Sequence, residues 1–295
     1  MSQGSYAVLG AGGIGGLIAG ALAHGGHSMT LIVRPGAEQP ARLQVDSDVL
    51  GSFEEEVAVV TELSQPVDIL WVTVKAGQLE AALRQVARDR VREAVIPLLN
   101  GLDHMEVLRR HFGDELVATG TIAVESERVA PGRIRQLGGF INVVLAGPRQ
   151  EVVEGVALDL KSAGISARAT EDGRKALWAK LIILAAISLS TTAAQAPLGR
   201  LRGDPEWRPL ILGTMSEIRR VAAAEGVELE EPVAALDALP DPMRSSMQKD
   251  AAAGRPLELD HIAGPVLRRG REHGVATPAT EELARRIRER YPDLT

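Results

Sequence analysis

Six residues near the start of the chain have the spacing of a phosphate-binding loop. Gly10-Ala11-Gly12-Gly13-Ile14-Gly15 matches the pattern G-x-G-x-x-G, directly follows the apolar run Tyr6 to Leu9 and opens an apolar helical pattern. That context is the one a dinucleotide-binding loop requires: Gly10 permits the tight turn, Gly12 lets the backbone approach a pyrophosphate, and Gly15 allows close helix packing. Unpaired N–H groups at the helix start would then face the phosphates. The motif predicts a bound dinucleotide, with a glycine-rich turn that holds no ligand as the alternative.

The end of the second predicted strand indicates which dinucleotide is preferred. An aspartate or glutamate about 20 residues after the glycine loop would bind the ribose 2'-hydroxyl of NAD. The chain has Val33-Arg34-Pro35 there instead. Because a guanidinium pairs with a phosphate through two parallel hydrogen bonds, Arg34 favours the 2'-phosphate of NADPH. The alternative is that Arg34 is a solvated loop charge.

Two further polar residues follow predicted strands. Lys75 comes after the run Asp68 to Val74, and Asn100 comes after a run that begins at Ala94. Parallel sheets of this type bind ligands outside the carboxyl ends of their strands, so we expect both residues on the ligand side. Ordinary solvated loop residues are the alternative reading.

Lys180 opens a strongly apolar stretch, Leu181 to Ile187, within a predicted helix. A lysine there that faces a cleft between domains can donate a proton to a carbonyl oxygen as hydride reaches the carbon. Leu184 and Ser188, four and eight residues on, share its helical face. The alternative is a lysine that extends from a buried helix end to solvent.

Ser246 and Glu258 are weaker candidates. Each lies near a predicted helix start, where serine and glutamate also serve as caps or first-turn charges. The 6 histidines lack metal-ligand spacing and the chain has no cysteine. We therefore expect no catalytic metal and no disulfide, and redox chemistry would need a bound cofactor.

The elements that must position these residues differ between the two halves of the chain. The first half alternates strands and helices, which predicts a mostly parallel sheet of the Rossmann type. We expect a helix over Gly13 to His24, an antiparallel hairpin turning at Gly138-Gly139 between Arg133 to Leu137 and Phe140 to Leu145, and a helix over Pro148 to Ser162. The other expected strands are Ser28 to Val33, Glu56 to Val60, Asp68 to Val74, Ala94 to Pro97, Leu116 to Ala123 and Ile165 to Ala169.

After about Thr170 the strand pattern disappears and only helices are expected. They cover Gly173 to Gln195, Glu206 to Glu225, Pro232 to Leu239, Ser245 to Ala253, Leu257 to His273 and Thr280 to Tyr291. The predicted organisation is an α/β chain with a Rossmann dinucleotide-binding domain over residues 1–170 and an all-helical domain over 171–295. A small-molecule site is expected in a cleft between them.

Composition excludes several classes of partner. The 33 basic and 39 acidic residues give a net charge of -6, so the chain lacks the basic excess of a nucleic-acid binder. The longest uninterrupted apolar run is far shorter than a membrane span, and no signal peptide is recognisable. We expect a cytoplasmic protein without a membrane or nucleic-acid partner, and the Ala- and Leu-rich helices could support a homodimer.

Six ordered blocks resemble the ketopantoate reductase family, the NADPH-dependent 2-dehydropantoate 2-reductases, over nearly the whole chain. They are GAGGIGG from Gly10, VTVKAGQ from Val72, LLNG from Leu98, WAKL from Trp178, SSMQKD from Ser245, and LELDHIAG with HGVATP from Leu257 to Pro278. The resemblance implies reduction of a 2-keto acid, with ketopantoate reduction in pantothenate biosynthesis as the leading case.

The resemblance also implies roles for single residues. Lys180 falls on the family's catalytic lysine and Glu258 on its active-site glutamate. Ser246 falls on a serine that holds the substrate carboxylate, and Asn100 on an asparagine beside nicotinamide and substrate. The implied cofactor contacts are Arg34, Lys75 and Gln78.

One departure affects the substrate. The family has asparagines four and eight residues after the lysine, and this chain has Leu184 and Ser188. Because the family asparagines bond the substrate hydroxyl, the leucine indicates a more apolar 2-keto acid or a paralogue, with Ser188 as a partial replacement. Two alternatives stay open: a dehydrogenase of 3-hydroxy acids or imines, and a catalytically silent NADP-binding redox sensor.

Overall fold

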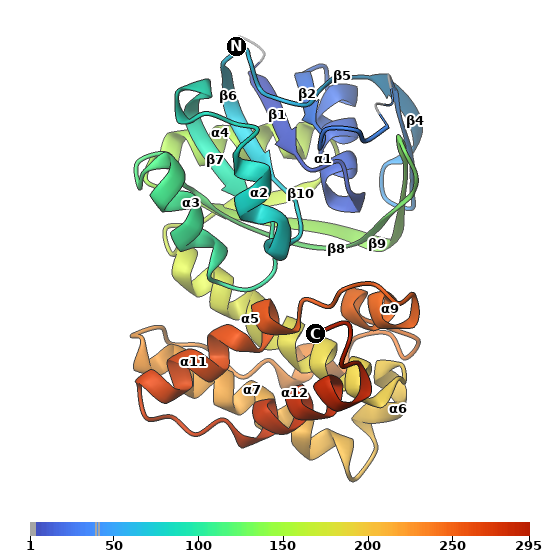
Figure 1. The fold of residues 1–295 in the computed structure, drawn as a ribbon, viewed down its shortest axis with the longest axis vertical. Coiled ribbons are helices and arrows are strands. Elements are labelled where there is room, and N and C mark those ends of the chain that lie inside the picture. Colours follow the sequence, from blue (N-terminus) through green and yellow to red (C-terminus); the bar gives the residue numbers. More distant parts are fainter. Residues whose placement is uncertain (1–3, 39, 41) are drawn as a thin grey trace. The chain divides into compact units, whose positions relative to one another are not determined.

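The computed structural model describes residues 4–38, 40 and 42–295, which form two compact units. The N-terminal unit comprises the described residues up to Leu99 together with His104–Gly173. The C-terminal unit comprises Asn100–Asp103 and Arg174–Thr295. Figure 1 follows the order of the elements along the chain.

A parallel sheet carries the glycine loop. Its strands are ordered β5-β2-β1-β6-β7, and every pair is parallel. The chain leaves β1 to one side for β2 and later returns to its other side for β6, so the strand order reverses beside β1. Ligands bind at such reversal points. The bounds are β1 Ser5–Leu9, β2 Ser28–Ile32, β5 Ala58–Val60, β6 Val67–Val72 and β7 Val91–Pro97.

A second, mixed sheet was not expected from the sequence. It is ordered β10-β9-β3-β4, and β8 pairs antiparallel with β9. The bounds are β3 Arg42–Ser47, β4 Gly51–Glu56, β8 Thr119–Ala130, β9 Arg133–Ala146 and β10 Ser166–Ala169. Because Glu56 ends β4, the expected strand from Glu56 to Val60 is really the end of one strand and the start of another in a different sheet.

The predicted hairpin at Gly138-Gly139 is wrong. Both residues lie inside the continuous strand β9, and the chain reverses at Pro131-Gly132 instead. Gly138 has a φ of +82°, and the β8–β9 register shifts nearby, between Ala123 and Glu125. The glycine pair therefore marks an irregularity within a strand rather than a turn between two strands.

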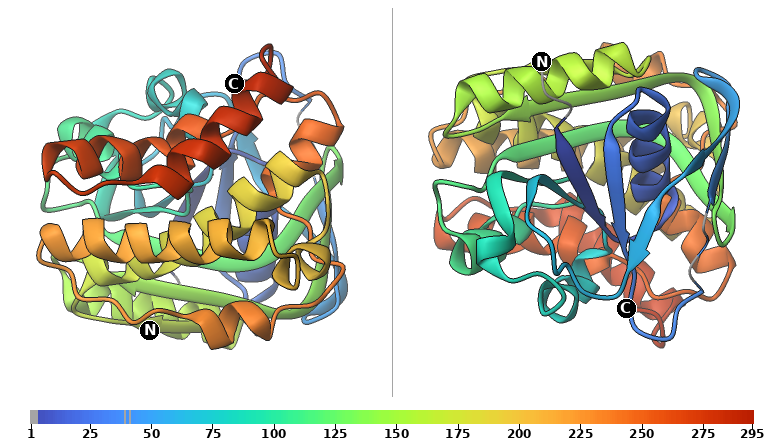
Figure 2. Two further views of the ribbon diagram at one scale, coloured as in Figure 1. Left: turned by 90° about the horizontal axis from the view of Figure 1, so that it is seen from below. Right: turned by 90° about the horizontal axis from the view of Figure 1, so that it is seen from above.

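Helices α1 (Gly13–His24) and α4 (Gln150–Ser162) each contact strands of both sheets. In the right-hand view of Figure 2, blue α1 lies beside a green strand of the β8–β9 pair. Two glycines one turn apart permit this approach, because a Cβ at Gly16 would lie 2.4 Å from Ile134 Cδ1 and one at Gly20 would lie 2.6 Å from Val45 Cγ2. A helix covered on several sides must be apolar all round, as the sequence of α1 is.

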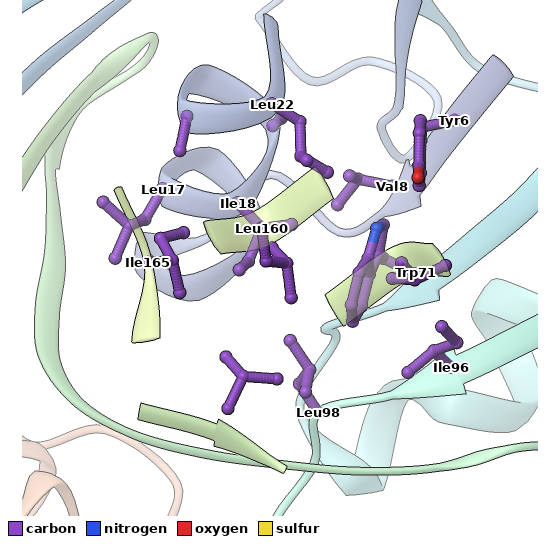
Figure 3. Packing of buried hydrophobic residues seen from close by; sticks show 14 of the residues in the cluster. Tyr6, Val8, Leu17, Ile18, Leu22, Trp71, Ile96, Leu98, Leu160 and Ile165 are labelled. Carbon is purple, nitrogen blue, oxygen red and sulfur yellow. The ribbon is translucent and has the colours of Figure 1, made fainter. Parts of the chain in front are cut away.

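The core of the N-terminal unit lies around α1. Figure 3 shows Ile18 and Leu22 of α1 with Leu160 of α4 and Trp71 of β6, all of them buried. Tyr6 of β1 donates its hydroxyl to Asp159 of α4, which ties that helix to the parallel sheet. The short helices α2 (Leu79–Leu83) and α3 (His104–Phe112) and the 3₁₀ turns Ala76–Gln78 and Arg88–Arg90 complete the unit.

The regular elements that the structure describes in the C-terminal unit are all helices. Its elements are α5 Gly173–Ala194, whose first residue still belongs to the N-terminal unit, α6 Leu198–Arg202, α7 Trp207–Ala224, α8 Val233–Asp237, α9 Ser246–Ala252, α10 Leu259–Ile262, α11 Gly264–Glu272 and α12 Pro278–Arg290. One helix was expected over Leu257 to His273, but the structure divides it at Ala263, just before Pro265. Proline lacks the N–H that a continuous helix would use.

Helix α5 is the central apolar element of this unit. It is long and apolar enough to span a membrane by length and composition alone, yet 72% of its most apolar 18-residue window is buried inside the structure. That burial is typical of a core helix in a folded protein.

Candidate active site

The glycine loop forms a tight turn between β1 and α1. Gly10 has a φ of +108°, and a Cβ there would lie 2.8 Å from Val74 Cγ1. At Gly15 a Cβ would lie 2.0 Å from the carbonyl oxygen of Gly10. A side chain is therefore excluded by backbone conformation at the first position and by close packing at the second.

Gly12 differs from these two glycines because the space beside it is open. A Cβ at Gly12 would have no atom within 4 Å, although Gly12 is the N-cap of α1. Gly12 has no side chain with which to cap this helix, and the first turn of the helix contains no acidic residue. The start of α1 thus offers backbone N–H groups to an anion approaching from the open side.

A groove of about 1200 Å³ extends from this loop across the carboxyl ends of β1, β2 and β6. It brings together five of the predicted cofactor residues: Gly10, Gly12, Arg34, Lys75 and Gln78. Gly13, Ile14 and Gly15 form the first turn of α1 and do not line it. These groups fit the phosphates of a dinucleotide, because backbone N–H groups lie at the open Gly12 and the cationic side chains of Arg34 and Lys75 line the same groove.

The end of β2 is held in place by a side-chain amide. Gln85 Nε2 donates to the carbonyl oxygens of Val33 at 2.6 Å and Thr61 at 2.8 Å. Arg34 follows directly and is exposed along the groove. Sequence reasoning missed four other charged residues that line the groove: Glu38, Glu62, Arg84 and Arg128. They follow no motif, and Arg128 comes from the unexpected second sheet.

In the C-terminal unit, a short loop holds Asn100 against Glu258. Asn100 Nδ2 donates to Glu258 Oε2 at 3.1 Å. The loop approaches α10 so closely that a Cβ at Gly101, where φ is +83°, would lie 2.1 Å from the carbonyl oxygen of His261. Asp103 then accepts a hydrogen bond from Arg269 of α11 at 3.0 Å. Both contacts fix the amide of Asn100 relative to the carboxylate of Glu258.

Lys180 of α5 lies near this carboxylate and is half-buried. Burial lowers the pKa of Lys180 to about 8, and the charge of Glu258 opposes that shift. A lysine with this pKa is mostly protonated at neutral pH but releases its proton more readily than a solvated lysine. It can therefore act as a proton donor.

The other predicted substrate residues occupy different environments. Leu184 is half-buried on α5, while Ser188 is fully buried and its Oγ has no hydrogen-bond partner among the described residues. The cap of α9 is Ser245, whose Oγ accepts from Gln248 N at 3.0 Å and bonds Thr191 Oγ1 at 2.9 Å. Ser246 is the first residue of the helix and is exposed. Its hydroxyl is therefore not the cap.

Known proteins resemble the chain along most of its length. Residues 6–148 match the model of ketopantoate reductase PanE/ApbA, and residues 172–291 match that of the C-terminal region of ketopantoate reductase PanE/ApbA. The chain belongs to the ketopantoate reductase family. It is therefore an oxidoreductase that acts on the CH–OH group of a 2-hydroxy acid and the carbonyl group of its 2-keto counterpart.

Individual relatives agree with this assignment. The chain is 30% identical to the 2-dehydropantoate 2-reductase of Caulobacter vibrioides over 93% of this chain and 95% of the relative. It is 28% identical to the enzyme of the same name from Halobacterium salinarum, over 95% and 97%. The crystal structure of 2-dehydropantoate 2-reductase from Methylococcus capsulatus has a TM-score of 0.87 and 27% identity, covering 99% of this chain and 98% of that one. Within the part of the chain that the structure describes, no three His, Cys, Asp or Glu side chains lie close enough together to hold a metal ion.

Proposed function

We propose that the protein catalyses the NADPH-dependent reduction of a 2-keto acid to a 2-hydroxy acid, with Lys180 as the proton donor. The observation that carries this proposal is the half-buried Lys180, whose pKa is lowered to about 8, beside a Glu258 held by Asn100. The named relatives make ketopantoate the first substrate to test, as a step toward pantothenate.

NADPH would supply the hydride in this reaction. As hydride reached the carbonyl carbon, Lys180 Nζ would donate its proton to the carbonyl oxygen, which would complete the alcohol and leave a neutral amine. The amine then regains a proton from solvent. Because Glu258 favours the charged ammonium, it keeps Lys180 protonated before the reaction, and Asn100 orients the carboxylate that does so.

Two side chains would bind charged parts of the substrate and the cofactor: Ser246 the substrate carboxylate, and Arg34 the 2'-phosphate of NADPH. The exposed hydroxyl of Ser246 is available to the substrate carboxylate, as the family resemblance implies. The preference for NADPH over NADH rests on Arg34, because the groove offers a guanidinium directly after β2. Glu38 and Glu62, which also line the groove, are the carboxylates that would favour NADH instead if they bound a ribose 2'-hydroxyl.

Leu184 supports a second candidate substrate, a branched 2-keto acid without the hydroxyl of ketopantoate. A leucine offers neither donor nor acceptor to a substrate hydroxyl. A site that lacks the hydrogen-bonding partner should not discriminate strongly in favour of the hydroxylated acid. The buried Ser188 hydroxyl supplies such a partner only if the substrate reaches it.

The test compares ketopantoate with its analogue lacking the hydroxyl, using NADPH and NADH separately and following nicotinamide absorbance. We expect turnover with NADPH and loss of turnover in Lys180→Ala. We also expect Leu184→Asn to raise the kcat/KM ratio of ketopantoate over the analogue at least about tenfold. Full turnover in Lys180→Ala contradicts the proton-donor role, and tight NADPH binding without reduction of any carbonyl favours a silent redox sensor. A cytoplasmic location and a homodimer remain predictions, to be checked by cell fractionation and light scattering.

A further inference from the structure

The groove in the N-terminal unit has more positive charge than the glycine motif and Arg34 account for. Its lining includes the cationic side chains Arg34, Lys75, Arg84 and Arg128, against the carboxylates Glu38 and Glu62. Arg128 differs from the others because it comes from β8, a strand of the second sheet.

Strand β8 packs directly on the first turn of α1. Ser126 Oγ donates to the carbonyl oxygen of Gly13 at 2.9 Å. A Cβ at Gly13 would lie only 2.5 Å from the carbonyl oxygen of Ser126. Thus β8 passes beside the helix start where the open Gly12 would receive a pyrophosphate.

The strand register places Arg128 on the groove side of β8. Side chains two residues apart on a strand point to the same face, so Arg128 shares the face of Ser126. Its cross-strand partner is Ile134, which both packs against Gly16 of α1 and lines the groove. Glu127, which lies between Ser126 and Arg128, is opposite Arg135 in the strand register. Both of these exposed residues belong to the other face of the strand pair.

The β8–β9 turn lies beside the loop that follows Arg34. A Cβ at Gly132 would lie 2.6 Å from Pro40 Cβ, and the carbonyl oxygen of Gly132 accepts from Gln44 N at 2.8 Å. Arg128 therefore lies on the strand between the pyrophosphate end of the groove and the loop that carries Arg34. Arg128 is exposed and forms no ion pair among the described residues.

We propose that Arg128 binds a phosphate of the dinucleotide, so that the second sheet contributes a cation to the cofactor site. The inference rests on the proposed function, since it requires a dinucleotide in the groove. Guanidinium and phosphate match in geometry and charge, and such charge-assisted hydrogen bonds are stronger than neutral ones. Arg128 could make this contact with either the pyrophosphate or the 2'-phosphate. Only NADPH has the 2'-phosphate, so a comparison of NADPH with NADH distinguishes the two.

The experiment measures dissociation constants for NADPH and NADH by nicotinamide fluorescence at low and high salt. Three proteins are compared: the unaltered chain, Arg128→Ala, and Arg135→Ala, which removes the same charge from the opposite face of the hairpin. We expect Arg128→Ala to weaken NADPH binding about tenfold or more and to reduce its salt dependence, because a phosphate contact is lost. Arg135→Ala should stay within about twofold.

Each outcome has a defined meaning. A loss confined to NADPH assigns Arg128 to the 2'-phosphate, and an equal loss for both dinucleotides assigns it to the pyrophosphate. Arg128→Lys should retain part of the affinity, which distinguishes a charge contact from a folding defect. Unchanged binding in Arg128→Ala overturns the inference alone, whereas an unaltered chain that binds neither dinucleotide overturns the proposed cofactor as well.

Discussion

At the scale of single residues, burial and charge act on Lys180 in opposite directions. Burial disfavours the ammonium and lowers its pKa to about 8, while the carboxylate of Glu258 stabilises the ammonium. The first effect is the larger, so the side chain titrates within the range in which enzymes are commonly assayed. This balance leads to two predictions.

The first prediction concerns the pH dependence of reduction. Because the proton donor is the charged form of Lys180, kcat/KM should fall as the pH rises through about 8. Replacing Glu258 with glutamine removes the charge that raises the pKa of Lys180. In Glu258→Gln, the fall of kcat/KM with rising pH should therefore begin at a lower pH, whether or not the maximum activity also decreases. Asp260→Asn, which alters an exposed carboxylate on α10, is the control, and identical profiles for both variants would show that Glu258 does not act on the donor.

The second prediction concerns stability. An unfolded lysine has a pKa of about 10.4, so the unfolded chain binds more protons than the folded one between pH 8 and that value. The free energy of unfolding should accordingly rise with pH over this range through Lys180. Lys180→Met should abolish that rise and stabilise the protein at pH 7 by about 1 to 3 kcal/mol while eliminating turnover. Urea unfolding at pH 7 and 10 measures both effects, with the exposed Lys175→Met as control. Destabilisation by Lys180→Met at pH 7 would contradict the argument.

At the scale of elements, a buried carboxylate joins two helices of the C-terminal unit. Glu217 of α7 is 3% exposed and accepts three hydrogen bonds from the start of α12. The donors are Ala279 N at 2.7 Å, Thr280 N at 2.9 Å and Thr280 Oγ1 at 2.7 Å. A negative charge at a helix N-terminus is also favoured by the helix dipole. Glu217 therefore supplies the cap that α12 lacks at Thr277.

The third prediction follows from this cap. Glutamine at position 217 keeps the shape but presents an amide NH₂ where one carboxylate oxygen now accepts a hydrogen bond. Glu217→Gln should lower the free energy of unfolding by about 2 to 4 kcal/mol, because a buried donor then loses its partner. Glu228→Gln, at an exposed position of the same unit, should change it by less than about 0.5 kcal/mol. Equal urea midpoints for the two variants would exclude the capping role.

The sequence predicted elements best where the local pattern has a single explanation. Gly13 to His24 was expected as a helix and is α1, because the glycine loop before it and the apolar pattern within it both indicate one. The second sheet was missed because β3 and β4 consist mostly of polar residues, and because the pairing of β3 with the distant β9 leaves no local signal. Gly138-Gly139 was misread because glycines mark both turns and strand irregularities.

The same distinction holds for the candidate site. Motifs indicated Gly10 and Gly12 of the glycine loop, Arg34 and Lys75, which all follow strands and line one groove. The contact between Asn100 and Glu258 joins residues 158 positions apart, and only the resemblance to a family placed both in one site. Arg128 had neither a motif nor a resemblance, and its placement required the register of β8 with β9.

At the scale of the whole molecule, a bound cofactor should stabilise the folded chain. A ligand that binds only the folded state adds about 2.7 kcal/mol to the free energy of unfolding at 100 times its dissociation constant. The fourth prediction is that NADPH raises the midpoint of thermal unfolding more than NADH at equal concentration. Arg34→Ala should remove most of that difference, because the side chain expected at the 2'-phosphate is gone. A larger shift with NADH would reverse the cofactor assignment.

The chain path sets a condition for anyone who recombines this enzyme with its relatives. Asn100–Asp103 lies in the first half of the sequence, yet it belongs to the same compact unit as residues 174–295. A chimera joined near residue 173 would carry the amide partner of Glu258 and the carboxylate partner of Arg269 from a different parent. Transplanting the helical half intact therefore requires that this tetrapeptide be exchanged along with it.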